Sequence, residues 1–238
     1  MEPLNKLSFN LDNGSSRSFL HRGTPADLGV LAQIFQNKDY SLEKLRRGAE
    51  LSAEYHSIIE SQKTPLIIDA GANIGASALW FSLTYPFAHT TCFEPENSNY
   101  RLLAINTVGL NVELHEAAVG AVDGTVDLFD PGTGEWGYQT KRNPNGSVKL
   151  MSLDQLVKSK KMAGYQPFIV KIDIEGGEAE LFSSDTSWVN EFPLLIIELH
   201  DWLLPAQRTS ANFLRTISQL DRDFVHIGEN IFSIRNHK

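Results

Sequence analysis

A glycine-containing turn after a buried strand carries the clearest chemical signal in the sequence. Residues 66–68 form an apolar run, and the motif Asp69-Ala70-Gly71-Ala72-Asn73-Ile74-Gly75 follows it before an amphipathic helix. Gly71 and Gly75 permit a tight turn and leave room for a ligand against the backbone. The first turn of the helix offers free N–H groups and the positive end of its dipole. The pattern is typical of a ligand-binding strand–turn–helix unit, and a tight turn without a ligand is the alternative.

The glycine spacing and the nearby acidic residues distinguish between ligands. A dinucleotide fingerprint needs G-x-G-x-x-G, whereas this turn reads G-x-x-x-G. Asp69 would repel a pyrophosphate and suits a ligand that carries an ammonium or a sulfonium. Glu94 ends the second predicted strand, where a carboxylate can accept hydrogen bonds from both ribose hydroxyls of an adenosine. The residues expected to bind a cofactor are therefore Asp69, Gly71, Asn73, Gly75, Glu94 and, from a later strand, Asp173.

A second group of ionisable residues follows the apolar strand 168–172. Lys171 lies inside this strand, where an ammonium must pair or reach solvent. Asp173 and Glu175 follow at the carboxyl end and are candidates for pairing with it, and Lys171 and Glu175 are also candidates for substrate contact. Glu178 and Glu180 come next and are expected only to favour the N-terminal dipole of the following helix.

Two more candidates follow the next apolar strand, residues 194–197. Glu198 and His200 are two positions apart and so share one face. In a doubly wound sheet this strand lies beside strand 168–172 and near Asp69, so we expect the acidic residues and His200 to converge on one crevice.

The elements that must position these residues alternate between strand and helix from Pro65 onward. Strands that are apolar throughout are buried on both faces, as in a parallel sheet covered by helices. The repeated order predicts an α/β, doubly wound and mostly parallel sheet. The chain ends with a predicted antiparallel hairpin over residues 224–227 and 231–234. The earlier strand candidates are residues 66–68, 91–93, 111–114, 168–172 and 194–197.

Two segments stand outside this alternation. Residues 1–62 are predicted to be a polar, turn-like segment to about residue 22, followed by a helical cap that packs on the main domain, residues 63–238. Thr24 and Pro25 start the first helix of that cap, and a second helix is expected from Ser41 to Ile59. Residues 124–150 form an insertion that is either a plain hairpin or a lid, and Trp136 and Tyr138 in it are candidates for stacking on a ligand.

The composition excludes several classes of protein. The net charge is −8 over 238 residues, which argues against a nucleic-acid binder. Cys92 is the single cysteine, so neither an intramolecular disulfide nor a cysteine-built zinc site is expected. We expect no signal peptide and no membrane span. A cytoplasmic protein is therefore predicted, with a homodimer through the N-terminal helices as an option.

Four of these motifs in order resemble the FkbM-type methyltransferases. They are residues 68–75, Phe93-Glu94-Pro95, residues 171–176 and Glu198-Leu199-His200, and the resemblance extends over about residues 24–235. It implies the Rossmann-like, seven-stranded sheet of class I methyltransferases and an S-adenosylmethionine-binding domain over residues 63–238. It also implies O-methylation of a hydroxyl on a small molecule, a sugar or a natural product.

Methyl transfer from a sulfonium to such a hydroxyl needs alignment and removal of a proton. A base with a pKa of about 7 suits this step, which favours His200, with Glu198 or Asp173 orienting it or sharing the role. Mg²⁺ held by Asp173, Glu198 and His200, with Glu175 near, would instead acidify the hydroxyl directly. We expect no metal, because Mg²⁺ prefers oxygen ligands and no compact all-carboxylate cage is visible.

Two other functions remain as alternatives. A non-catalytic protein that keeps the cofactor pocket predicts binding without turnover. A nicotinamide-dependent oxidoreductase on the same sheet is disfavoured by the missing third glycine.

Overall fold

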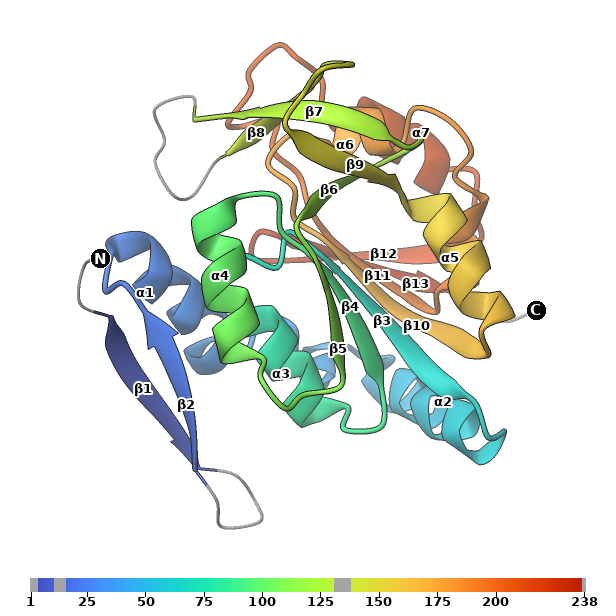
Figure 1. Cartoon of the computed structure of the whole chain (residues 1–238). Coiled ribbons are helices and arrows are strands. Elements are labelled where there is room, and N and C mark those ends of the chain that lie inside the picture. Colours follow the sequence, from blue (N-terminus) through green and yellow to red (C-terminus); the bar gives the residue numbers. More distant parts are fainter. Residues whose placement is uncertain (1–3, 11–15, 131–137, 237–238) are drawn as a thin grey trace.

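The centre of the computed structural model is a seven-stranded sheet with helices on both faces (Figure 1). The model describes residues 4–10, 16–130 and 138–236. The strand order is β12-β13-β11-β10-β3-β4-β5, with the neighbours from β11 to β5 parallel and β13 antiparallel to both β11 and β12. The α/β class is thus confirmed, and the sheet is mixed. The bounds are β3 (Thr64–Ala70), β4 (His89–Phe93), β5 (Val112–His115), β10 (Tyr165–Ile172), β11 (Leu194–Glu198), β12 (Arg222–Ile227) and β13 (Asn230–Arg235).

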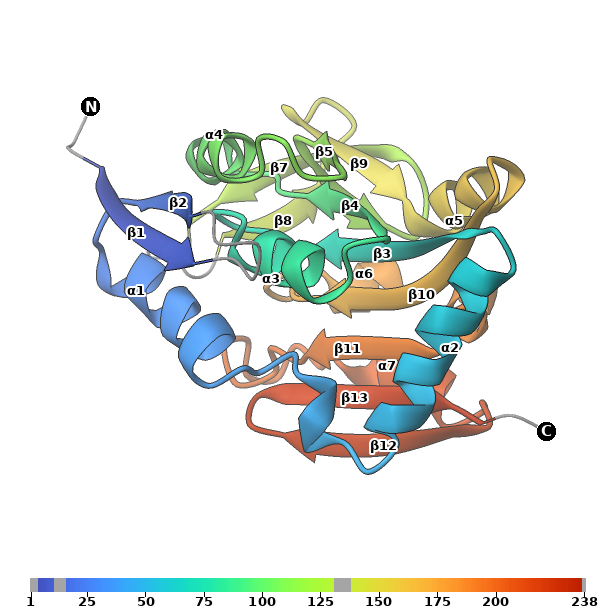
Figure 2. The same ribbon diagram turned by 90° about the horizontal axis from the view of Figure 1, so that it is seen from below.

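Alternate residues of the central strands pack into two separate hydrophobic cores, one on each face of the sheet. Ile67 and Ile196 pack with the helices on one face, and Ile68 and Ile197 pack with those on the other. This two-sided burial explains why the strands are continuously apolar. Figure 2 shows α2 and α3 along one side of the sheet. The helices of the sheet are α2 (Gly48–Glu60), α3 (Ala76–Thr84), α4 (Asn97–Asn106), α5 (Leu153–Met162), α6 (Glu178–Leu181), the 3-10 helix η4 (Ser187–Glu191) and α7 (Ala211–Ile217).

The chain reverses its direction across the sheet between β3 and β10. From β3 it proceeds to β4 and β5 on one side, and later it returns to β10 and β11 on the other. The Asp173 N–H donates to the carbonyl of Ala70 (3.0 Å), so the loops after these two strands remain joined beyond the sheet. Such a switch point leaves a crevice at the carboxyl ends of the strands.

The N-terminal segment differs from the sequence prediction in two places. Its first part is a β-hairpin, β1 (Asn5–Asn10) and β2 (Ser16–His21), instead of a turn-like stretch. Asn106 of α4 holds this hairpin in place, because its side chain accepts from the Leu20 N–H (2.7 Å) and donates to the Leu20 carbonyl (2.9 Å). The prediction failed because the hairpin is stabilised by contacts distant in sequence, namely Asn106 and the packing of Phe19 into the core beside Phe35.

The cap helices begin as predicted but are interrupted. Helix α1 (Pro25–Leu31) is capped by Thr24, whose hydroxyl accepts from the Asp27 N–H (3.2 Å), and continues as a π-helix, η1 (Ala32–Gln36). The single helix expected from Ser41 to Ile59 is wrong. A short 3-10 helix, η2 (Leu42–Lys44), ends at Leu45 in an extended conformation, and α2 starts only at Gly48.

The insertion predicted over residues 124–150 belongs to a second, four-stranded sheet with the order β6-β9-β7-β8, which begins earlier, at Ala117, and ends at Ser152. Its strands are β6 (Ala117–Gly120), β7 (Gly124–Phe129), β8 (Gln139–Arg142) and β9 (Val148–Ser152). Tyr138 lies directly before β8, whereas Trp136 lies outside the described residues. Among the helices in the described ranges, none is both long and apolar enough to cross a bilayer.

Candidate active site

The turn after β3 requires glycine because other backbone crowds it. Gly71 has φ +80°, and a Cβ atom there would lie 1.7 Å from the carbonyl oxygen of Asp173. Gly75 has φ +92° and is the N-cap of α3. The N–H groups of Gly71 and Ala72 both donate to the Phe93 carbonyl, at 3.0 and 2.9 Å. The loops that follow β3, β4 and β10 therefore meet closely, and side chains from all three surround the same space.

That space is a pocket that is open to solvent at its mouth. The lining contains these residues that the sequence selects: Gly71, Asn73, Glu94, Tyr138, Asp173 and Glu175. Asp69 and Gly75, also selected for the cofactor, are not part of this lining.

Further lining residues are missing from the sequence prediction. Asn99 comes from α4, and Ala118 and Val119 come from β6 at the start of the insertion. Together with Phe93 they give the pocket an apolar wall with one amide beside it, which suits an aromatic heterocycle. For Ala118 and Val119 the only signal in the sequence is the apolar run 117–119, which looks the same as a run of ordinary core residues.

Glu94 is a buried carboxylate on this pocket, with 5% of its surface exposed. One of its oxygens accepts from the Asn73 N–H (2.8 Å) and the other from the Glu96 N–H (2.9 Å). Burial raises the pKa of Glu94 to about 7, and the two backbone hydrogen bonds oppose the shift without cancelling it. Each oxygen has a further lone pair, so the group can still accept hydrogen bonds from a vicinal diol.

Asp69 and Lys171 form a buried ion pair behind the pocket. The Lys171 ammonium lies 3.2 Å from Asp69 Oδ1 and 3.5 Å from Asp173 Oδ2, and it donates to the Gly71 carbonyl (2.6 Å). The other Asp69 oxygen accepts from the Ser77 hydroxyl (2.6 Å). Lys171 therefore pairs as the sequence requires. The pair holds the glycine turn on β10, and the charge of Asp69 is already matched by Lys171.

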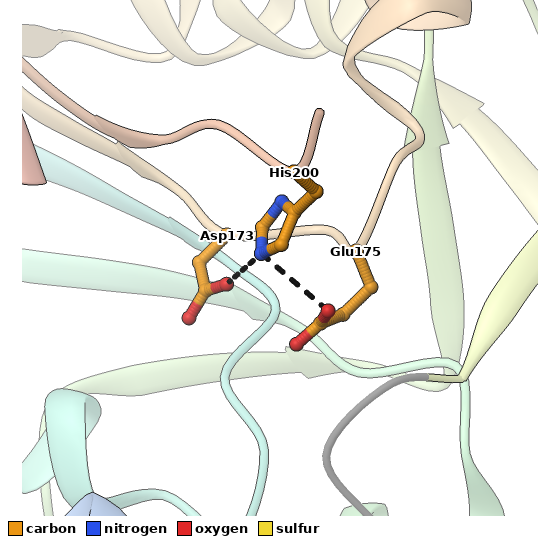
Figure 3. Close-up of side chains that lie close together, drawn as sticks. All are labelled: Asp173, Glu175 and His200. Carbon is orange, nitrogen blue, oxygen red and sulfur yellow. Dashed lines mark ion pairs between the residues drawn. The ribbon is translucent and has the colours of Figure 1, made fainter. Parts of the chain in front are cut away.

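The imidazole of His200 lies at the centre of a carboxylate cluster. His200 is 1% exposed, and its Nε2 atom is 3.6 Å from Asp173 Oδ1 and 3.4 Å from Glu175 Oε2 (Figure 3). Glu198 Oε1 is a further 3.6 Å neighbour of Nε2. The opposite ring nitrogen, Nδ1, is hydrogen-bonded to Glu178 Oε1 at 2.8 Å. The structure brings Asp173, Glu175, Glu198 and His200 together as expected, whereas Asp69, predicted for the same crevice, is buried against Lys171.

The role of Glu178 differs from the sequence prediction, which gave it only a favourable interaction with the helix dipole. It is fully buried against His200, so favouring the helix dipole is not its main role. Glu180, by contrast, forms a half-exposed ion pair with Arg142 (2.6 Å). Nothing in the local sequence separates these two glutamates, because the contact of Glu178 is made across the fold.

The charges in the cluster shift one another's pKa values. Burial of the ring lowers the pKa of His200, but the hydrogen bond to Glu178 and the nearby carboxylates outweigh burial and raise it to about 10. Burial, reinforced by Asp173, raises the pKa of Glu175 to about 8 and that of Glu198 to about 7. The carboxylates around the ring therefore favour the imidazolium form, which argues against the predicted use of His200 as the base.

A second groove, of about 740 Å³, adjoins the cluster on the side of β11 and the β12–β13 turn. Glu198 lines this groove and contacts His200, so the two spaces are neighbours. Trp202 contributes an indole that is 70% exposed, with its ring centroid 6.5 Å from that of His200. An exposed indole beside a polar cluster is typical of a binding surface for a ring-shaped ligand.

Known proteins resemble this chain in sequence and in fold. The family model described as a methyltransferase FkbM domain matches residues 69–225. The hexuronic acid methyltransferase AglP of Haloferax volcanii is 27% identical over 194 residues, covering 77% of this chain and 79% of that protein. Among solved structures, the SAH-bound Podospora anserina methyltransferase PaMTH1 has a TM-score of 0.45 at 10% identity, covering 88% of each chain. Cofactor-bound Rv0187 from MTB has a TM-score of 0.44 at 11% identity, covering 91% of this chain and 100% of that one.

Proposed function

The chain belongs to the FkbM methyltransferase family, and from that premise we propose that it is an S-adenosylmethionine-dependent O-methyltransferase acting on a sugar hydroxyl. The observation that carries the proposal is the adjacency of two sites. The pocket that contains Glu94 and the glycine turn shares Asp173 and Glu175 with the ionisable cluster around His200. A cofactor and an acceptor can therefore meet at Asp173.

The residues of the first pocket fit the chemistry of S-adenosylmethionine. The Glu94 carboxylate suits the ribose diol, and the apolar wall of Phe93, Ala118 and Val119 suits the adenine. Asp173 offers negative charge at the far side, where an ammonium and a sulfonium would be stabilised. When bound, the cofactor supplies the methyl group as an electrophile.

The protein's own residues align the acceptor and receive its proton. We assign the acceptor to the second groove, the one lined by Trp202, and call it the acceptor groove. Glu198 lines this groove and contacts His200, so its carboxylate can accept the hydroxyl proton as the new carbon–oxygen bond forms. The hydrogen bond to Glu178 and the nearby carboxylates favour a protonated His200, so we assign the proton to Glu198. His200 holds the carboxylates together instead, and Glu178 fixes its orientation.

The lining of the acceptor groove also indicates which class of acceptor it can bind. Trp202 offers an apolar platform for the face of a sugar ring, and the named relative from Haloferax volcanii acts on a hexuronic acid. Among the described residues, the lining of this groove holds Glu198, Glu229 and His226 but neither lysine nor arginine. Two carboxylates disfavour an anionic ligand, so we expect a neutral hexoside to be a better acceptor than the matching hexuronide.

A methyl-transfer screen tests the proposal. The purified chain is incubated with S-adenosylmethionine and pairs of hexosides and hexuronides, and products are analysed by mass spectrometry for the added methyl group. Calorimetry with S-adenosylhomocysteine is run in parallel. Absence of cofactor binding would refute the proposal, and binding without turnover across a broad glycan panel would favour the non-catalytic alternative.

A further inference from the structure

One atom at the centre of the cluster forms no hydrogen bond with any described residue. His200 is almost completely buried, and its Nδ1 atom is bonded to Glu178, but Nε2 points at oxygens of Asp173 and Glu175 without bonding either (Figure 3). A ring nitrogen that faces carboxylates normally forms a hydrogen bond of about 2.7–2.9 Å. The separations are instead 3.4 and 3.6 Å.

Those separations match the spacing of ligands around a metal ion. Two donor atoms that each lie about 2.1 Å from an ion are about 3.4 Å apart in tetrahedral geometry and about 3.0 Å apart along an octahedral edge. The donor atoms of Asp173, Glu175 and His200 all lie within 4.8 Å of one another. Only a small closing movement of two carboxylates would bring all three to bonding distance of one ion.

The partner of the opposite ring nitrogen supports the same interpretation. Histidines that bind metals usually donate their other N–H to a carboxylate, which fixes the tautomer and increases the basicity of the ligand nitrogen. Glu178 is fully buried and is bonded to His200 Nδ1 in this way. Displacing the Nε2 proton would leave a lone pair directed between Asp173 and Glu175.

We propose that Asp173, Glu175 and His200 form a binding site for a divalent cation with open coordination positions. Two carboxylates and one imidazole are a mixed oxygen and nitrogen set, which suits Mn²⁺, Co²⁺ or Zn²⁺ better than Mg²⁺. The sequence prediction considered Mg²⁺ at Asp173, Glu198 and His200 and disfavoured it because Mg²⁺ prefers oxygen ligands, an objection that does not apply to Mn²⁺, Co²⁺ or Zn²⁺. Glu198, the third carboxylate near Nε2, remains free to serve as the base.

The catalytic use of this cation rests on the proposed function. An acceptor hydroxyl in an open position would have its pKa lowered, so its proton passes more readily to Glu198. The oxygen then bonds to the methyl carbon as the carbon–sulfur bond breaks. The bonding pair stays on sulfur, which leaves neutral S-adenosylhomocysteine.

The test measures metal binding without any reaction. The full chain is treated with chelator, and Mn²⁺ is titrated by calorimetry and by electron paramagnetic resonance, with no cofactor present. We expect one Mn²⁺ per chain, with spin-echo modulation from a bound ¹⁴N that disappears in His200→Gln. Asp173→Asn and Glu175→Gln should each weaken Mn²⁺ binding by at least about tenfold.

The matched control is Glu113→Gln, which removes a carboxylate from a separate cluster that contains His89 and His115. Glu113 contacts His89 (3.5 Å) and His115 (2.8 Å) and pairs with Lys160, so it tests for nonspecific charge effects. Its Mn²⁺ affinity should equal that of the wild type. If a variant does not fold by circular dichroism, the ¹⁴N signal of the wild type decides the question on its own.

Two outcomes overturn this inference. One is that the wild type binds none of Mn²⁺, Co²⁺ and Zn²⁺, and the other is that binding is the same in the ligand variants. S-adenosylhomocysteine binding is measured on the same samples. Cofactor binding without metal binding refutes the metal site alone, and metal binding without cofactor binding refutes the proposed function alone.

Discussion

Replacing Glu94 with glutamine should weaken cofactor binding and remove its dependence on pH. The Glu94 carboxylate has a pKa raised to about 7 by burial, so in the free protein it is mostly protonated at pH 6 and mostly ionised at pH 8. If the ribose diol binds the ionised form, the affinity of the wild type should rise about tenfold between these pH values, following the ionised fraction. At pH 8, Glu94→Gln loses the charge and one of two acceptor oxygens, which we expect to cost about 2 kcal/mol, or about 30-fold in Kd.

The probe for this measurement is 5′-methylthioadenosine, which keeps the ribose diol but has no amino or carboxyl group that titrates between pH 6 and 8. Calorimetry in two buffers of different ionisation enthalpy should also show close to one proton released on binding at pH 6 to the wild type. The variant should release none. The same pH dependence in both proteins, or an unchanged Kd at pH 8, would refute the assignment of Glu94 to the ribose.

Ionisation of Glu94 should lower the stability of the free protein, although it should strengthen cofactor binding. The pKa of Glu94 in the folded chain lies above its ordinary value, so its contribution to stability is fully present below pH 4.5 and is lost as the pH rises through about 7. Cofactor binding should offset this loss, and thermal shifts on adding the probe should therefore be larger at pH 8 than at pH 6.

Three further substitutions test the buried ion pair, the turn and the acceptor groove. Lys171→Met should lower the free energy of unfolding in urea by about 3–5 kcal/mol, because it leaves buried Asp69 unpaired. The control Lys161→Met removes a surface ion pair with Glu191 and should cost at most about 1 kcal/mol. Equal losses in the two variants would contradict the role of burial. Gly71→Ala should abolish binding of S-adenosylhomocysteine or prevent folding, since its Cβ meets backbone at 1.7 Å, while Gly109→Ala, with φ +77° and open space, should cost only about 1–2 kcal/mol and leave binding intact. Trp202→Ala should raise the KM of a sugar acceptor about tenfold and leave the Kd of S-adenosylhomocysteine unchanged, and a change in the Kd instead would place the indole in the cofactor pocket.

The sequence by itself determined the alternating strands and the glycine turn, because both are local. Buried parallel strands are apolar at consecutive positions, and a tight turn beneath a neighbouring loop demands glycine at Gly71. Once the order of strands follows from their connections, residues at neighbouring carboxyl ends must meet. That is why Asp173, Glu198 and His200 could be placed in one crevice from spacing alone.

The tertiary structure decided what each of these groups can do. The pKa of His200 depends on the carboxylates of Glu178, Asp173 and Glu175, which follow a different strand from His200, and Glu178 looked like an ordinary residue of a helix start. The N-terminal hairpin likewise depends on Asn106, far along the chain. Burial and charge interactions act over a few ångströms in space, irrespective of the distance along the sequence. Composition and periodicity can therefore place a titratable side chain on a strand end, but only the packed fold sets its charge, its hydrogen-bond partners and its access to a ligand.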